Sequence, residues 1–489
     1  MELKEKKFYG LYREDKFQGF AFLLLLLFSL VMFISVVFRF FGHDEFEHIH
    51  SAWYVARGYQ PYLDFFQVHH PLLWFLLAPV IAILGESLTT FFVIRFLMAF
   101  LTLGSGYILF RLTKLVTGSR EVALISAVFL LSTVMFVEKG IQVRPDVPQV
   151  FFALLSLHYI VLFFKRKREK KYRYICLSGL FAGISFLFLQ KSVFLLLAYG
   201  FVFLYRLIKK ELSLKSVVLF SLFFLLPNLS LVVYLAAAGT FPEYILTNWL
   251  VPGRLLAHFS PHYILFGMWA ENLLLWLLLI ASMIAICLKM FRPPRRAGKR
   301  ANREMLMLLF IALVFFICAC LMRLPFKQNF MLPMALFCIP ASYFFKVLSW
   351  KSRWTVKKKR NALAIVTLIP FLILTAMIFL SNRSQVEKIK FVLNHTKGSE
   401  EVYDGDIQFN LFRKDLHYFW YGLKKNKEFT TYKKFSGSNI KYADYNIYRL
   451  IREKKPAFIS DTRLKITKGG LDKLYKKTAF EGLYIRVTQ

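Results

Sequence analysis

The amino-acid sequence predicts an α-helical protein that crosses a membrane many times and ends in a small α/β domain. Of its 489 residues, 57% are hydrophobic and 19% are charged, whereas soluble domains contain about 45–50% apolar and about 25% charged residues. The excess lies in long apolar runs such as residues 20–38 and 305–322, each long enough to cross a hydrocarbon layer of about 30 Å. This composition excludes a soluble globular enzyme, a disordered chain and a collagen-like chain.

Basic residues are concentrated in short segments between the apolar runs. Lys and Arg number 65 against 29 Asp and Glu, which gives a formal net charge of +36. Short loops rich in Lys and Arg stay on the cytoplasmic side of a membrane, so the pattern indicates membrane topology and we expect no nucleic-acid partner. The segments expected in the cytoplasm are 1–16, 111–120, 165–173, 209–215, 289–303 and 351–360. All five cysteines fall within apolar runs, so disulfide bonds are not expected.

The chain must cross the membrane an even number of times between two cytoplasmic segments, and this orders the spans. The first span, at about residues 18–38, leads into an outer loop at 39–88. Its apolar stretch 71–84 is shorter than the ~20 residues of a span, so we expect a juxtamembrane or re-entrant helix on the outer side. The other spans, which bring the total to about eleven, are expected near 89–112, 121–138, 147–164, 175–207 (a tight pair), 216–237, 263–288, 305–322, 330–349 and 362–381.

The composition changes to a soluble kind after residue 380, which predicts a domain boundary. Residues 1–380 are expected to form the membrane domain of a protein of the cytoplasmic (inner) membrane. Residues 381–489 are expected to form an extracytoplasmic α/β domain, because the last span ends outside and long domains are exported regardless of their charge. Hydrophobic patterns predict helices at 386–395, 439–453 and 471–478, and strands at 402–407, 457–460 and 483–487.

The outer loop carries an unusual set of polar residues close to the membrane surface. Residues 43–50 read HDEFEHIH, residues 58–66 read GYQPYLDFF, and residues 69–72 read HHPL. Acidic groups at such a depth are costly unless they are paired or used. A solvated loop, with acids that begin a helix near Asp44, is the alternative interpretation.

These motifs, in this order, resemble the GT-C superfamily of membrane glycosyltransferases. The most similar members are the bacterial protein-mannosyltransferase-like and lipid A aminoarabinose-transferase-like branch. Further motifs follow in the expected order: Arg95, the RPD of residues 144–146, Gly179 and Gly183 before Gln190–Lys191, and the KQNFMLP of residues 327–333. The resemblance covers roughly residues 18–350 and implies a GT-C-like transmembrane catalytic domain, to which the C-terminal domain is added as an exported tail.

The resemblance implies sugar transfer from a polyprenyl-phosphate-linked donor at the outer face, by an inverting displacement. Such a step needs a carboxylate that takes the acceptor's proton and groups that stabilise the departing phosphate. By position, Asp44 is the catalytic base, and Glu45 is expected to raise the pKa of one carboxylate by like-charge repulsion. Asp146 occupies the second acidic position, where it orients a metal, the acceptor or the donor. A loop carboxylate for Asp44 and a helix N-cap for Asp146 are the alternatives.

Lys191 is the expected ligand of the lipid phosphate, because an ammonium between two apolar half-spans is costly unless it meets an anion or a cavity. Reaching out to the headgroups is the alternative. Arg254 and Lys327 are weaker candidates for the same phosphate. The residues expected to support the site are Asp64, as a structural carboxylate of the loop, with Arg95 and Arg144.

A divalent metal ion is left open, because relatives differ in whether they need one. His48, His69 and His258 are candidate ligands, although no zinc-type spacing fixes them. The family glutamate before the Pro of the HHPL segment is replaced by His69 and His70, which puts an inherited metal site in doubt. The expected partners are the lipid-linked sugar, membrane lipids and an acceptor glycan, lipid or protein.

Two other classes of function are open on the sequence alone. One is a transporter or lipid-sugar flippase, although transporters place ionisable groups near the membrane midplane and here they gather at one face. The other is a non-catalytic envelope assembly protein that binds through its C-terminal domain.

Overall fold

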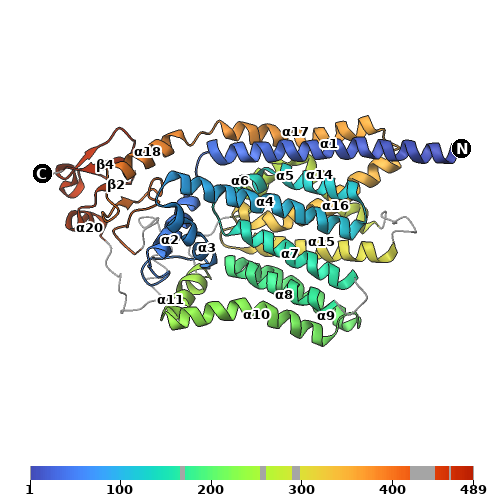
Figure 1. The fold of residues 1–489 in the computed structure, drawn as a ribbon, viewed down its shortest axis with the longest axis horizontal. Helices are drawn as coiled ribbons and strands as arrows, with labels where there is room; N and C mark the ends of the chain where they lie inside the picture. Colours follow the sequence, from blue (N-terminus) through green and yellow to red (C-terminus); the bar gives the residue numbers. More distant parts are fainter. Residues whose placement is uncertain are drawn as a thin grey trace.

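A computed structural model describes residues 2–165, 171–253, 260–288, 298–418, 446–461 and 464–487. The molecule is elongated, with a bundle of long helices followed by a small domain that contains the sheet (Figure 1). The N-terminus lies at the far end of the bundle and the C-terminus at the opposite end of the molecule. The predicted fold class, a helical polytopic membrane protein with a small C-terminal α/β region, is confirmed.

Among the described residues, eight helical segments are long and apolar enough to cross a membrane. The helices that contribute to them are α1 (Glu2–Phe38), α4 (Leu88–Thr117), α7 (Asp146–Lys165), α9 (Val193–Ile208) with η1 (Gln190–Ser192), α10 (Leu214–Ala237), α15 (Gly298–Leu321), α16 (Met331–Lys351) with η4 (Lys327–Phe330), and α17 (Val356–Ile378). The helix α8 (Lys171–Phe188) is apolar but shorter. The total of about eleven spans stays a prediction.

Two of the spans expected as continuous helices are broken. The helices α5 (Arg120–Ser132) and α6 (Val134–Gly140) are bent by 67°, and α13 (His262–Glu271) and α14 (Leu273–Cys287) by 100°. A break in a membrane helix exposes backbone groups that must find other partners. The side chain of Asn272 supplies one acceptor and one donor. Its Oδ1 accepts from the N–H of Val134 at 3.1 Å, and its Nδ2 donates to the carbonyl of Ser132 at 3.1 Å. One side chain therefore joins the two breaks.

Helices α8 and α10 pack closely where two glycines lie one turn apart. An added Cβ on Gly179 would collide with the carbonyl oxygen of Phe220, and one on Gly183 with that of Phe224. Small residues at this spacing allow two membrane helices to approach at backbone distance. This is the structural use of the Gly-x-x-x-Gly motif, which leads toward Lys191.

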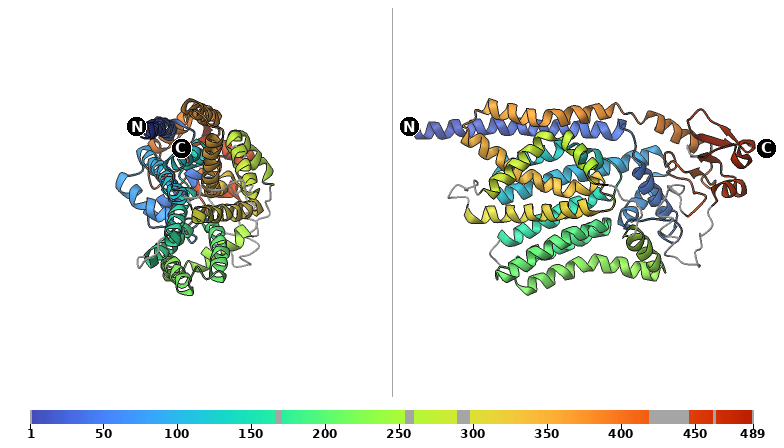
Figure 2. Two further views of the ribbon diagram at one scale, coloured as in Figure 1. Left: turned by 90° about the vertical axis from the view of Figure 1, so that its right-hand side faces the viewer. Right: turned by 180° about the vertical axis from the view of Figure 1, so that it is seen from behind.

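Short elements form a layer between the bundle and the C-terminal domain (Figures 1 and 2). They are α2 (His43–Ala56), α3 (Leu72–Leu84), α11 (Phe241–Ile245), η2 (Leu246–Leu250) and α12 (Val251–Gly253). Glu86, just after α3, forms ion pairs with Arg57 at the end of α2 and with Arg413 of the C-terminal domain. The chain therefore does not use α3 to reach the other end of the bundle, and the placement of this helix relative to the membrane stays a prediction.

The C-terminal region contains helices and a four-stranded sheet. Its elements are α18 (Arg383–Asn394), β1 (Tyr403–Asp404), α20 (Ile447–Lys454), β2 (Phe458–Ser460), η7 (Lys468–Lys473), β3 (Tyr475–Lys477) and β4 (Leu483–Arg486). The strand order is β1-β2-β4-β3, with β1 parallel to β2 and the other pairs antiparallel. The helix expected at 471–478 is wrong: η7 ends at Lys473 and β3 follows, because it pairs with β4. Of the helix expected at 439–453, residues 439–445 lie outside the described residues.

Candidate active site

Four residues separate the end of α1 from the start of α2, which carries the acidic pair Asp44 and Glu45. The carboxylate of Glu45 accepts a hydrogen bond from the N–H of Gly42 at 2.8 Å, which satisfies one of the free N–H groups at the start of the helix. Successive side chains on a helix point about 100° apart. Asp44 and Glu45 therefore leave α2 in different directions and take part in different interactions.

Asp44 belongs to a polar network that joins four parts of the chain. Its carboxylate pairs with Arg144, whose Nε lies 3.3 Å from Oδ2 of Asp146. The other oxygen of Asp146 pairs with the ammonium of Lys191, which also donates to Oδ1 of Asn329 at 2.8 Å. The structure thus brings together the two acids and the lysine that the resemblance selected. We call Asp44, Arg144, Asp146, Lys191 and Asn329 the acid–base network.

The exposure of the charged groups differs sharply within the acid–base network. The side chain of Asp44 is 41% exposed, whereas those of Arg144, Asp146 and Lys191 are only 8%, 4% and 8% exposed. The carboxylate of Asp146 is already paired with two cations of the protein, Arg144 and Lys191. Asp44 is the acid of this network that a second molecule can reach. A substrate that needs a carboxylate would therefore meet Asp44 first.

The electrostatics of Asp44 are set mainly by burial and by Arg144. Burial tends to raise the pKa of the Asp44 carboxyl, but Arg144 and the nearby His48 and His69 outweigh this, so the pKa lies below its ordinary value. In turn, although burial opposes it, the two carboxylates raise the pKa of Arg144 above its already high value. Asp44 is therefore ionised at neutral pH.

The expected repulsion between Asp44 and Glu45 does not govern this site. Glu45 is fully buried, lies 3.0 Å from Nε of Arg95, and accepts from the N–H of Val143 at 3.3 Å. Arg95 also donates to the carbonyl of Val36 at 2.6 Å. The pair thus braces the end of α1 and the segment before Arg144, and the like-charge role expected for Glu45 is corrected to a structural one.

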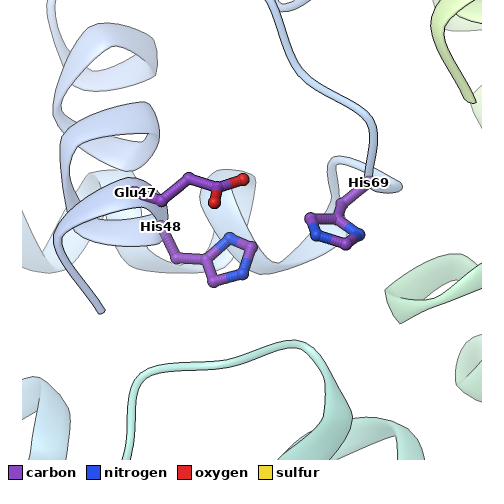
Figure 3. Close-up of side chains that lie close together, drawn as sticks. All are labelled: Glu47, His48 and His69. Carbon is purple, nitrogen blue, oxygen red and sulfur yellow. The ribbon is translucent and has the colours of Figure 1, made fainter. Parts of the chain in front are cut away.

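A second group of side chains next to the acid–base network has the composition of a metal site. Donor atoms of Glu47, His48 and His69 lie within 4.8 Å of one another. Glu47 and His48 are neighbours on α2, while His69 projects toward them from a separate loop (Figure 3). Two imidazoles and a carboxylate are ligands that zinc accepts, and three protein ligands leave a position open. We call these three residues the histidine–glutamate cluster.

Burial keeps the imidazoles of the histidine–glutamate cluster neutral. It lowers the pKa of His48 well below the ordinary value and that of His69 to about 4, although the nearby carboxylates act in the other direction. Neutral imidazole is the form that binds a metal. Nδ1 of His48 accepts a hydrogen bond from Nε1 of Trp74 at 3.2 Å, which holds the ring in place.

The remaining candidate residues lie apart from the acid–base network or outside the described residues. Lys327 pairs with Glu271 and lies 4.0 Å from Glu138, so it belongs to a neighbouring charge cluster. Asp64 accepts from the N–H of Gln60 at 2.6 Å and closes a turn of the loop. Arg254 and His258 lie outside the described residues.

Sequence reasoning did not assign roles to Asn329 and Glu47, although both lie in quoted motifs. Asn329 comes two residues after Lys327, and its Nδ2 donates to the carbonyl of Leu324 at 3.1 Å, which aims its oxygen at Lys191. No local pattern signals this contact, because its partner is 138 residues away. For Glu47, the position next to His48 was a usable signal.

Comparison with known proteins places this architecture. A family model described as dolichyl-phosphate-mannose-protein mannosyltransferase matches residues 68–234. An uncharacterized protein of Aquifex aeolicus is 26% identical over 165 residues, which make up 34% of this chain and 29% of that protein. The chain therefore matches less than a third of the length of this relative.

Two solved structures share the fold at low sequence identity. ArnT from Cupriavidus metallidurans, bound to undecaprenyl phosphate, superposes with a TM-score of 0.63 and 11% identity over 84% of this chain and 87% of its own. The Archaeoglobus fulgidus oligosaccharyltransferase, in complex with Zn and sulfate, gives a TM-score of 0.51 and 13% identity over 78% of this chain and 60% of its own. The resemblance read from the motifs is confirmed, and the chain has the fold of the GT-C superfamily of membrane glycosyltransferases.

Proposed function

We propose that this protein transfers a sugar from a polyprenyl-phosphate-linked donor to an acceptor at the outer face of the membrane. The observation that carries the proposal is the acid–base network, which holds one accessible carboxylate next to buried cations. The matching family model is named for a dolichyl-phosphate-linked sugar donor, and the structurally similar ArnT was solved with undecaprenyl phosphate. Both support a lipid phosphate as the carrier.

In the proposed reaction, an acceptor oxygen attacks the anomeric carbon of the donor sugar. Asp44 takes the proton of the acceptor as the new C–O bond forms, and the bond between the anomeric carbon and the phosphate oxygen breaks with inversion. The polyprenyl phosphate leaves with the electron pair. Arg144 holds Asp44 in place and keeps it ionised before the acceptor arrives.

Lys191 is placed to bind the departing phosphate. An ammonium has three N–H donors, and in this structure two of them are used by Asp146 and Asn329. One donor remains for a phosphate oxygen, where preorganised positive charge lowers the energy of the developing anion. Asp146 thus acts on the donor through Lys191, which fixes the direction of the ammonium.

Charge and geometry support the proposed outer location of the site. The basic start of α1 lies at one end of the bundle, and α2 with the C-terminal domain lies at the other (Figure 1). A cytoplasmic position for the basic end places the acid–base network outside. In a cysteine-free background, Glu86→Cys should react with a membrane-impermeant maleimide in intact cells, and Lys357→Cys only after permeabilisation. The reverse labelling pattern would contradict the proposed side.

A divalent metal ion fits the histidine–glutamate cluster. Such an ion would supply a positive charge for the phosphate, and Glu47, His48 and His69 would hold it. We expect the purified protein to retain zinc after incubation and dialysis, measured by mass spectrometry of the metal content, and His69→Gln to lose it. His70→Gln is the matched control, because His70 already uses Nδ1 on the carbonyl of Phe186 and Nε2 on the hydroxyl of Tyr244. Equal metal content in both variants would disprove the site.

The proposed function is tested with purified protein in detergent. A panel of synthetic polyprenyl-phosphate sugars, offered with candidate acceptors, should yield a glycosylated acceptor and free polyprenyl phosphate in equal amounts, measured by mass spectrometry. A flippase would leave every donor intact while moving the lipid across the bilayer of a liposome. An assembly protein would do neither. Either result, with a folded protein and the whole panel tested, would refute the proposal.

A further inference from the structure

The C-terminal domain is fastened to the elements that build the candidate active site. The N–H of Phe66 donates to the carbonyl of Tyr418 at 2.9 Å, and the hydroxyl of Tyr418 donates to the carbonyl of Tyr62 at 2.7 Å. Arg413 lies 3.0 Å from the carboxylate of Glu86, beyond α3. These contacts join residues 413–418 to the chain on both sides of the HHPL segment. This part of the domain therefore packs on the layer of short elements that lies between the bundle and the C-terminal domain.

The most buried of these contacts is made by α2 itself. Nε2 of His50 lies 2.6 Å from Oδ2 of Asp415, and the two side chains are 0% and 2% exposed. Nδ1 of the same ring lies 3.1 Å from the carbonyl of Leu411. Both nitrogens of one α2 side chain are therefore held by the C-terminal domain. A buried charged or polar pair of this kind has a narrow range of favourable geometries.

Asp415 is held in turn by its own surroundings. Its Oδ2 accepts from Nδ2 of Asn410 at 3.1 Å, and its backbone N–H donates to the hydroxyl of Tyr54 at 2.9 Å. The carboxylate of Asp404 accepts three backbone N–H groups, from residues 408, 409 and 410, each at 2.8 Å. The loop that presents Asp415 is thus tied to the strand β1, and Asp415 meets α2 from a fixed position.

The C-terminal domain supports α2 at both ends. Near the start, Glu45 is held by Arg95 of α4 at 3.0 Å, and Nδ1 of His43 lies 3.0 Å from the carbonyl of Ile407 in the C-terminal domain. In the second half, His50 and Tyr54 lie one turn apart and face Asp415. Asp44 lies six residues before His50, on another side of the helix. The C-terminal domain therefore contacts both ends of α2, while the Asp44 side chain stays 41% exposed.

We propose that Asp415 is a positioning residue for sugar transfer, acting on Asp44 through His50 and α2. The inference rests on the proposed function, and it makes the C-terminal domain a working part of the active site. An error of about 1 Å in the placement of a reacting group can cost about 100-fold in rate. Lys191 belongs to η1 in the membrane bundle and is linked to α2 only indirectly in the acid–base network, through Asp146 and Arg144, so we expect donor binding to depend less on this support than the chemical step does.

The first test compares carboxylate-to-amide variants within the same domain. Asp415→Asn should lower kcat by about tenfold or more while the donor KM changes less than about twofold. Glu400→Gln is the matched control, because Glu400 pairs with Arg486 at 3.4 Å and not with α2. The kcat and the donor KM of this variant should equal those of the wild type. His50→Gln should reproduce the effect, and the double variant should be no worse than either single one, because the two residues act as one unit.

The second test does not need catalysis. Hydrogen–deuterium exchange of the peptide that covers α2 should accelerate in Asp415→Asn and stay unchanged in Glu400→Gln. Faster exchange in a protein whose wild type transfers no sugar would refute the proposed function and keep the structural coupling. Unchanged kcat, or reduced kcat with unchanged exchange of α2, would overturn the positioning role. A global loss of thermal stability in Asp415→Asn would assign the residue to folding instead.

Discussion

Replacing Asp44 by Asn should lower sugar transfer by about 100-fold or more, because positioned general-base catalysis contributes about 10²–10⁴-fold. The amide keeps the volume of the carboxylate and leaves an oxygen that still accepts from Arg144, while the basic oxygen is lost. The variant should therefore fold normally and bind the donor with little change. The measurement is kcat and the donor KM with purified protein, together with a thermal unfolding curve.

Two matched variants decide the assignment of the base. Asp64→Asn removes a carboxylate from the same loop, but Asp64 only closes a turn with Gln60. The rate of transfer should therefore stay within about threefold of wild type, far from the loss expected when a general base is removed. Asp146→Asn should raise the donor KM, because Asp146 orients Lys191. Near-complete transfer by Asp44→Asn combined with abolished transfer by Asp146→Asn would exchange the two roles.

The lowered pKa of Asp44 also sets the expected pH dependence. Arg144, acting against burial, keeps the Asp44 carboxylate ionised at neutral pH. A base with a depressed pKa stays active above that pKa and loses activity as the pH falls through it. Wild-type kcat/KM should therefore have no acid limb from Asp44 above the ordinary range of aspartate. Arg144→Gln removes this support and should move the acid limb upward.

The sequence predicted that Asp44, Asp146 and Lys191 lie on one side of the membrane, but it did not predict how they pair. Alternation of charge clusters put Asp44, Asp146 and Lys191 at one face, and the structure joins them. The pairing of Asp44 with Arg144 spans 100 positions of the chain, and no spacing rule covers such a distance. The pairing arises because the start of α2 packs against the segment just before α7, which carries Arg144.

The misplaced role of Glu45 has a simple physical origin. In a loop, two neighbouring carboxylates can face each other and repel. The structure has a helix from His43 to Ala56, and on a helix neighbouring side chains diverge. The HDEFEHIH segment lacks the long apolar periodicity that predicts a helix, because α2 buries polar residues such as Glu47 and His48.

The breaks in two spans were also beyond the reach of the sequence. Residues 121–138 and 263–288 have the length and composition of continuous spans. The bends occur at Thr133 and Asn272. The hydrogen bonds at these bends join Asn272 to Val134 and to Ser132, which are 138 and 140 positions away in the sequence. A local propensity cannot contain this information. The bend after α5 matters for function, because α6 leads directly into the segment that carries Arg144.

Lys191 is predicted to bind the phosphate of the lipid-linked donor, and its removal should raise the donor KM. The structure supports an inward role, because the ammonium is buried between Asp146 and Asn329 and does not reach out to the headgroups. A charge-assisted hydrogen bond contributes about 1.5–3 kcal/mol. Lys191→Ala should accordingly raise the donor KM by about ten- to a hundredfold.

Lys327→Ala is the control that separates a specific contact from a general loss of positive charge. Lys327 lies two residues before Asn329, the partner of Lys191, but its ammonium is matched by Glu271, so the donor KM should stay nearly constant. Both variants need a thermal unfolding curve, because Lys191→Ala leaves Asp146 with Arg144 as its remaining cation in the acid–base network. An unchanged donor KM in a folded Lys191→Ala protein, or a larger rise in Lys327→Ala, would move the phosphate site from Lys191 to the neighbouring charge cluster.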